Sequence, residues 1–153
     1  MNILDFQIIS CSIKIPPENL FQYWIDAVLT NKNEDSEIVI RIIDEEEMIV
    51  FNQQYRNKKG STNILSFPYE APESFNSILL GDLLICAPVI EKEALQQNKT
   101  LNNHWAHIVI HGILHLVGYD HVEDEDAEEM EAKEIEILKK IKIINPYQEK
   151  IKL

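Results

Sequence analysis

Four of the five histidines in this chain of 153 residues follow one another at spacings of three, four and four, at His104, His107, His111 and His115. Residues three or four apart lie on the same face of an α-helix, so the four imidazoles form one stripe. His111 and His115 are one turn apart, about 6 Å along the helix axis. This spacing lets both rings reach one ion through metal–nitrogen bonds of about 2.0 to 2.1 Å. The stripe therefore predicts a metal site.

A third ligand has to come from a chain that folds back, because six more residues of helix would add about 9 Å of rise. Gly118 follows His115 by three residues, where a left-handed glycine ends a helix. The chain after this glycine can then bring His121 back to the same ion. The predicted ligands are therefore His111, His115 and His121. Three imidazoles without a thiolate suit one divalent ion, Zn²⁺ before others, and leave a fourth position for water, as in catalytic sites.

The spacing H-x-x-x-H-x-x-G-x-x-H matches the signature of the metzincin proteases at the ligands and the glycine. Gly112, however, stands where those proteases carry the glutamate that acts as general base. Peptide hydrolysis would lack its proton acceptor, and we expect Gly112 to leave space beside the metal for a larger group such as a phosphodiester. His104 and His107 are expected to pack or to orient a ligand, with contact to substrate as the alternative for one of them.

The elements that must position these histidines follow from periodicity and from Gly and Pro. Strands are expected at 2–10, 37–43, 63–68 and 78–86, the last with a bulge or close backbone approach at Gly81-Asp82. Helices are expected at about 16–28, 44–56, 88–98, 101–117 and 122–141. We therefore predict an α+β fold in which a small mixed sheet of about four strands packs with about five helices. We expect the metzincin-like three-histidine site at the end of a long helix and one domain over 1–153.

The composition is that of an ordinary globular protein, with 45% apolar and 26% charged residues. No basic and apolar leader and no long apolar run is present, so we expect a cytoplasmic protein without a membrane partner. The net charge of −12 argues against non-specific coating of nucleic acid, and DNA is not an expected partner. Ten of the acidic residues lie between Asp120 and Glu136, which leaves a small basic island at Arg56, Lys58 and Lys59.

Three segments resemble sequence blocks of the YbeY family, bacterial metal-dependent endoribonucleases of ribosomal RNA maturation. They are HIVIHGILHLVGYDH at 107–121, YRNKKGSTNILSFP at 55–68 and LGDLLIC at 80–86, and the acidic stretch that follows is also similar. The match extends over essentially the whole chain. The resemblance implies His111, His115 and His121 as zinc ligands and Arg56 as the functional arginine. The family usually has Gly after that arginine, whereas this chain has Asn57, which could alter the loop and its basic side chains.

The resemblance implies a single-strand-specific endoribonuclease that matures the 3′ end of 16S ribosomal RNA and takes part in ribosome assembly and quality control. Ribosomal RNA, small-subunit proteins and assembly factors are then the expected partners. Arg56 suits the phosphate, because its planar guanidinium donates two parallel hydrogen bonds, although a helix-end charge is the alternative. Lys58 and Lys59 are expected to bind substrate, and Asp120 to orient a ligand imidazole or simply to end the helix.

Two other functions remain open at the level of sequence. The ligand spacing also suits a metal-dependent hydrolase of a peptide or small molecule, which the glycine at position 112 weakens. An acidic protein with a small basic patch could also be a ribosome assembly factor with little nuclease turnover. No general base is evident, and either water or the 2′-hydroxyl of RNA could attack the phosphorus.

Overall fold

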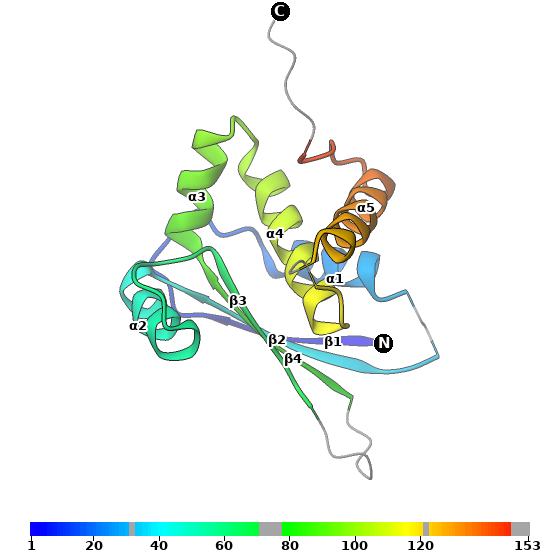
Figure 1. The fold of residues 1–153 in the computed structure, drawn as a ribbon, viewed down its shortest axis with the longest axis horizontal. Helices are drawn as coiled ribbons and strands as arrows, with labels where there is room; N and C mark the ends of the chain where they lie inside the picture. The colour runs from blue at the N-terminus through cyan, green and yellow to red at the C-terminus, as the bar shows by residue number, and fades with distance from the viewer. Residues whose placement is uncertain (31–32, 71–77, 121–122, 148–153) are drawn as a thin grey trace, which may run out of the picture.

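The computed structural model describes residues 1–30, 33–70, 78–120 and 123–147. Over these ranges the elements follow the predicted order, with boundaries within about two residues of those expected (Figure 1). They are β1 (Asn2–Ile8), α1 (Glu18–Val28), β2 (Ser36–Ile43), α2 (Glu45–Arg56), β3 (Ile64–Pro68), β4 (Leu79–Cys86), α3 (Ala87–Gln96), α4 (Leu101–Leu116) and α5 (Asp124–Lys140). The predicted α+β class is confirmed.

The four strands form one mixed sheet in the order β1-β2-β4-β3. β1 pairs with β2 in parallel, β2 pairs with β4 in parallel, and β3 runs antiparallel to β4 at the edge. The predicted irregularity is present, because the register between β2 and β4 shifts next to Gly81. A Cβ at Gly81 would lie 2.3 Å from the backbone oxygen of Phe67, and its φ of +151° is one that other residues rarely adopt.

Helices cover both faces of the sheet (Figure 1). Successive side chains of a strand point to opposite faces, and β4 shows this clearly. Its Leu83 and Ile85 belong to the large core that α1 and α4 build, where the rings of Phe21 and Trp105 lie 5.4 Å apart. Its Leu84 packs in a smaller core with Met48 of α2 on the other face. None of the helices in the described ranges is both long enough and apolar enough to span a membrane.

Gly112 lets α4 lie close to the sheet. A Cβ added there would lie 2.5 Å from Cδ1 of Ile64 in β3 and 3.0 Å from Cδ2 of Leu83 in β4. The expectation that this glycine leaves space beside a metal is therefore wrong, because the space is filled by aliphatic side chains of the sheet. What the glycine provides is a short distance between the histidine helix and the edge strand.

Replacing Gly112 by Val is expected to lower the free energy of unfolding by about 2 kcal/mol or more, because overpacking a filled site costs about 1 to 3 kcal/mol. Asn102→Val, on the exposed side of the same helix, is the control and should change stability by less than about 0.5 kcal/mol. Urea unfolding of both variants measures the difference. Equal stability of Gly112→Val and wild type would show that glycine does not set this spacing.

Candidate active site

Helix α4 ends just before Gly118, as the sequence predicts. Gly118 has φ +107°, its N–H donates to the carbonyl of His115 at 3.1 Å, and the N–H of Tyr119 donates to the carbonyl of Leu114 at 3.0 Å. These two bonds form a Schellman motif, which satisfies the last carbonyls of a helix while the chain turns away. The turn also directs the carbonyl of Tyr119 back to His115, whose Nδ1 lies 3.1 Å from it.

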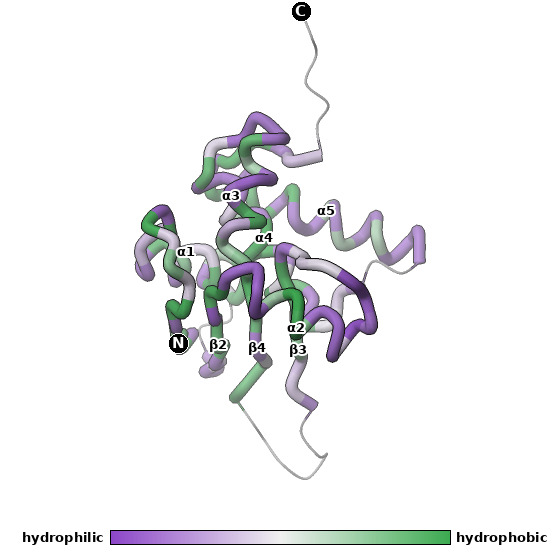
Figure 2. The backbone as a smooth tube through the Cα atoms, turned by 90° about the vertical axis from the view of Figure 1, so that its left-hand side faces the viewer, coloured by the Kyte–Doolittle hydropathy of each residue, from purple (hydrophilic) through white to green (hydrophobic). Residues whose placement is uncertain are grey.

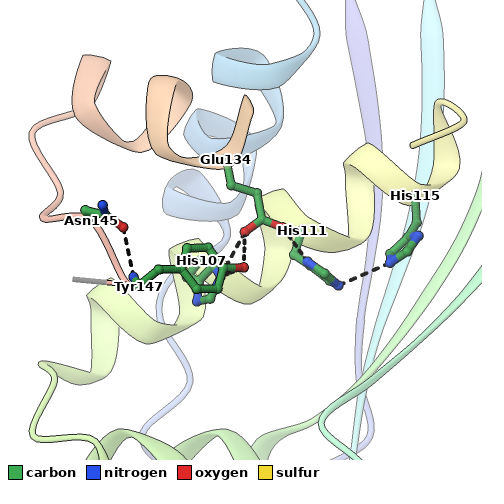
Figure 3. A network of polar contacts seen from close by, with 6 residues as sticks. All are labelled: His107, His111, His115, Glu134, Asn145 and Tyr147. Atoms are coloured by element: carbon green, nitrogen blue, oxygen red, sulfur yellow. Dashed lines mark hydrogen bonds and ion pairs between the residues drawn. The ribbon is translucent and has the colours of Figure 1, made fainter. Parts of the chain in front are cut away.

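His111 and His115 point their Nε2 atoms at each other across 3.1 Å (Figure 3). Nδ1 of His115 faces a backbone carbonyl and Nδ1 of His111 faces the carboxylate of Glu134, and both of these groups only accept hydrogen bonds. Each neutral ring therefore carries its proton on Nδ1, and each Nε2 presents a lone pair. Two facing lone pairs at this distance repel unless a cation lies between them.

This arrangement fits a metal ion. Two nitrogens bound tetrahedrally at about 2.0 to 2.1 Å would lie about 3.3 Å apart, close to the separation of the two Nε2 atoms. Over the ranges that the structure describes, no three His, Cys, Asp or Glu side chains are placed to hold a metal together. The third predicted ligand, His121, lies outside the described residues.

Glu134 of α5 is a residue of this site that the sequence analysis missed, because it counted Glu134 only as part of the acidic stretch. Its side chain is 0% exposed, and its carboxylate accepts hydrogen bonds from His111, from Nε2 of His107 at 3.1 Å and from the hydroxyl of Tyr147 at 2.5 Å (Figure 3). Burial alone would raise the pKa of Glu134, but the hydrogen bonds that its carboxylate accepts outweigh burial and lower the pKa to about 2. The sequence did contain a signal for this burial. Glu134 lies four residues from both Met130 and Leu138, so helical spacing places it on the buried face of α5.

The other two histidines of the stripe face protein groups, as expected for packing or orienting residues. His104 is 2% exposed, and its Nε2 lies 3.0 Å from a carboxylate oxygen of Glu93. Burial lowers the pKa of His107, against the opposite effect of its hydrogen bond to Glu134. A neutral His107 therefore donates from Nε2 to that carboxylate.

A cleft of about 700 Å³ joins the histidine pair to the end of α2. Its lining includes Arg56, His111 and His115, together with Asp120 and residues of the edge strand β3. The two lysines that were expected to bind substrate lie elsewhere. Lys58 and Lys59 are exposed in the turn after α2 and are not among the described residues that line this cleft. The structure thus brings Arg56 and the histidine pair together and places the lysines outside.

Asn57, which was expected to alter the loop after Arg56, ends α2 in the left-handed conformation with φ 53° and ψ 36°. Asparagine is one of the few residues other than glycine that adopts this conformation readily. The backbone after Arg56 therefore makes a turn that glycine would also allow. The N–H of Asn57 donates to the carbonyl of Gln53 at 3.1 Å.

The fold and the cleft define an α+β protein in which a histidine pair at a helix end and an arginine at the end of another helix line one cleft. The model of a protein family described as endoribonuclease YbeY matches residues 7–142. An endoribonuclease YbeY of Colwellia psychrerythraea is 48% identical over 152 residues, which cover 97% of this chain and 98% of that protein. The chain belongs to the endoribonuclease YbeY family. The comparisons therefore confirm the predicted family and, with it, the predicted class of enzyme.

A solved structure shows the same fold. The solution structure of TM1509 from Thermotoga maritima is similar with a TM-score of 0.55 at 22% identity, and the match covers 94% of this chain and 96% of that chain. At this identity the likeness concerns the fold alone.

Replacing either histidine of the facing pair by Ala is expected to abolish stable zinc binding, because one lone pair is then lost. The loss should exceed the roughly 10- to 100-fold that removal of an orienting partner costs. Arg56→Lys, which leaves both rings intact, is the matched control and should bind zinc like wild type. Competition with a chromophoric chelator measures the affinities. Unchanged zinc affinity in both His111→Ala and His115→Ala would contradict the site.

Proposed function

We propose that this chain is a metal-dependent endoribonuclease that cleaves single-stranded RNA during maturation of the 3′ end of 16S ribosomal RNA, using the one domain predicted for 1–153. The observation that carries the proposal is the cleft that combines Arg56 with the facing Nε2 atoms of His111 and His115. Membership of an endoribonuclease family supports the class of reaction. No observation favours a peptide hydrolase.

His111, His115 and His121 are the residues that would hold the ion, with zinc the one that three imidazoles suit best. When bound, a divalent ion supplies Lewis acidity toward a phosphoryl oxygen and lowers the pKa of water. The protein contributes the orientation of the rings. The carbonyl of Tyr119 and the carboxylate of Glu134 keep both Nδ1 atoms protonated, so that both Nε2 atoms face the cleft as lone pairs.

Arg56 is proposed to bind the phosphodiester and to stabilise the negative charge that develops on phosphorus. Its guanidinium is always charged and matches phosphate oxygens with two parallel donors. It lies in the last turn of α2 and is exposed in the same cleft as the histidines. Asp120 also lines the cleft, and we propose that it helps to orient the ligand set.

Tyr55 next to Arg56 supports a preference for unpaired RNA. Tyr55 is 56% exposed and lines the cleft, and its ring packs against Phe51, nearly parallel at 6.0 Å, and against Phe67, edge-on at 5.1 Å. Bases stack on such a fixed aromatic ring only when they are not enclosed in a duplex, and each stacked base contributes about 1 to 3 kcal/mol. We propose that a base adjacent to the cleaved phosphate stacks on Tyr55.

The negative charge of the chain supports delivery of the RNA by partner proteins. Much of α5 is hydrophilic in Figure 2, the chain carries a net charge of −12, and the basic surface near the cleft is small. Few phosphates can be neutralised, so affinity for free RNA is low. We propose that small-subunit proteins and assembly factors raise the effective concentration of ribosomal RNA at the cleft, in the cytoplasm, with Lys58 and Lys59 as outlying contacts.

Arg56→Lys tests the role of the planar guanidinium. It keeps the charge but loses the two parallel donors, so cleavage of a ribosomal precursor RNA should fall by about 10-fold or more, whereas zinc content and melting temperature should stay near wild type. Arg41→Lys, the same substitution at a residue of β2 that is not among those lining the cleft, is the matched control and should cleave almost normally. Equal cleavage by Arg56→Lys and wild type would count against bidentate phosphate binding.

Tyr55→Ala tests the stacking contact. The variant should bind single-stranded RNA about 5- to 100-fold more weakly, from the energy of one stacked base, and Tyr55→Phe should restore binding because the ring is kept. Fluorescence anisotropy with a labelled single-stranded fragment, and with the matching duplex, provides the measurement. If both variants bind like wild type, the base stacks elsewhere.

A further inference from the structure

A buried carboxylate, Glu134, connects the histidine pair to the C-terminal end of the chain (Figure 3). Both of its oxygens are used: Oε1 accepts from Nδ1 of His111, and Oε2 accepts from Nε2 of His107 at 3.1 Å and from the hydroxyl of Tyr147 at 2.5 Å. The donors come from α4 and from the segment after α5. One carboxylate thus joins three separate parts of the fold.

Such a group is expensive to bury, and a hydrophobic residue would pack there at lower cost. No Lys or Arg forms an ion pair with Glu134 among the residues that the structure describes, where its donors are histidines and a phenol. Stability therefore gives little reason for a carboxylate at this position. Its charge and its acceptor oxygen are better explained by their effect on the ring of His111.

We infer that Glu134 is the positioning residue for His111 and that Tyr147 holds Glu134 in place; this rests on the proposed metal site. The carboxylate keeps the proton of His111 on Nδ1, fixes the orientation of the ring, and increases the electron density at Nε2. It also adds a negative charge behind the ligand, which favours a bound cation. Residues that play this part behind a ligating histidine typically affect metal affinity by about 10- to 100-fold.

Tyr147 makes the segment after α5 part of this arrangement. Its backbone N–H donates to the side-chain oxygen of Asn145 at 2.8 Å, which forms a turn and directs the phenol toward Glu134. Its ring lies edge-on to His107 at 5.4 Å. Burial and the neighbouring carboxylate raise the pKa of Tyr147, so the hydroxyl stays protonated and donates. Tyr147 is 36 positions from His111 in the sequence, yet only one carboxylate separates the two side chains.

The test is the zinc affinity of the full-length chain carrying Glu134→Ala, Glu134→Gln or Tyr147→Phe, measured by chelator competition under conditions where circular dichroism shows native structure. Glu134→Ala removes acceptor and charge and should weaken binding by about 10- to 100-fold. Glu134→Gln keeps an acceptor oxygen and should lose less. Tyr147→Phe, which removes one donor to Glu134, should lose a few-fold. Glu128→Gln, exposed on the same helix, is the matched control and should bind like wild type.

The absorption spectrum of the cobalt-loaded protein gives a second readout, which a purely structural role would not change. The spectrum should shift in Glu134→Ala and Tyr147→Phe, because the orientation of His111 changes in both. It should stay unchanged in the Glu128→Gln control. Natively folded Glu134→Gln and Tyr147→Phe with wild-type affinity and spectrum would overturn the inference, even if Glu134→Ala fails to fold. Absence of zinc binding by wild type itself would instead overturn the proposed metal site.

Discussion

The site depends on one electrostatic constraint, the approach of the Nε2 atoms of His111 and His115 to 3.1 Å at the end of α4, each with a lone pair toward the other. The pair exists because both rings are protonated on the opposite nitrogen, one facing the carbonyl of Tyr119 and the other facing Glu134. The carbonyl is available because Gly118 turns the chain back, and the carboxylate is available because α5 buries one acidic residue. A helix end and a second helix thus prepare a place for positive charge.

The edge position of β3 explains how Arg56 and this pair come to line the same cleft. α2 packs on one face of the sheet and α4 on the other, so residues of the two helices can share a cleft only where the sheet ends. Gly112 brings α4 close to β3, and the left-handed Asn57 ends α2 just after Arg56. The cleft is therefore lined by both helices and by the strand between them.

Local sequence patterns were sufficient to predict most of the fold and, within the site, the histidine pair and the helix end that follows it. The order of strands and helices, the histidine stripe and the role of Gly118 follow from periodicity and turn chemistry within a few residues. Glu134 and Gly112 depend on which helix faces pack together, and that is a property of distant residues. Glu134 was concealed within a run of acids, and the reason for Gly112 lay in Ile64 and Leu83. Tyr147 could not be related to His111 without the packing of α5 on α4.

The central claim is that one cleft binds the metal at His111 and His115 and the RNA phosphate at Arg56. A crystal structure of the zinc-loaded protein with a short single-stranded RNA, carrying a non-cleavable linkage, tests it most directly. The account predicts zinc density at the two Nε2 atoms, with the non-cleavable phosphate between that density and the guanidinium of Arg56. Zinc bound away from the pair, or RNA bound outside the cleft with Arg56 in solvent, would contradict it.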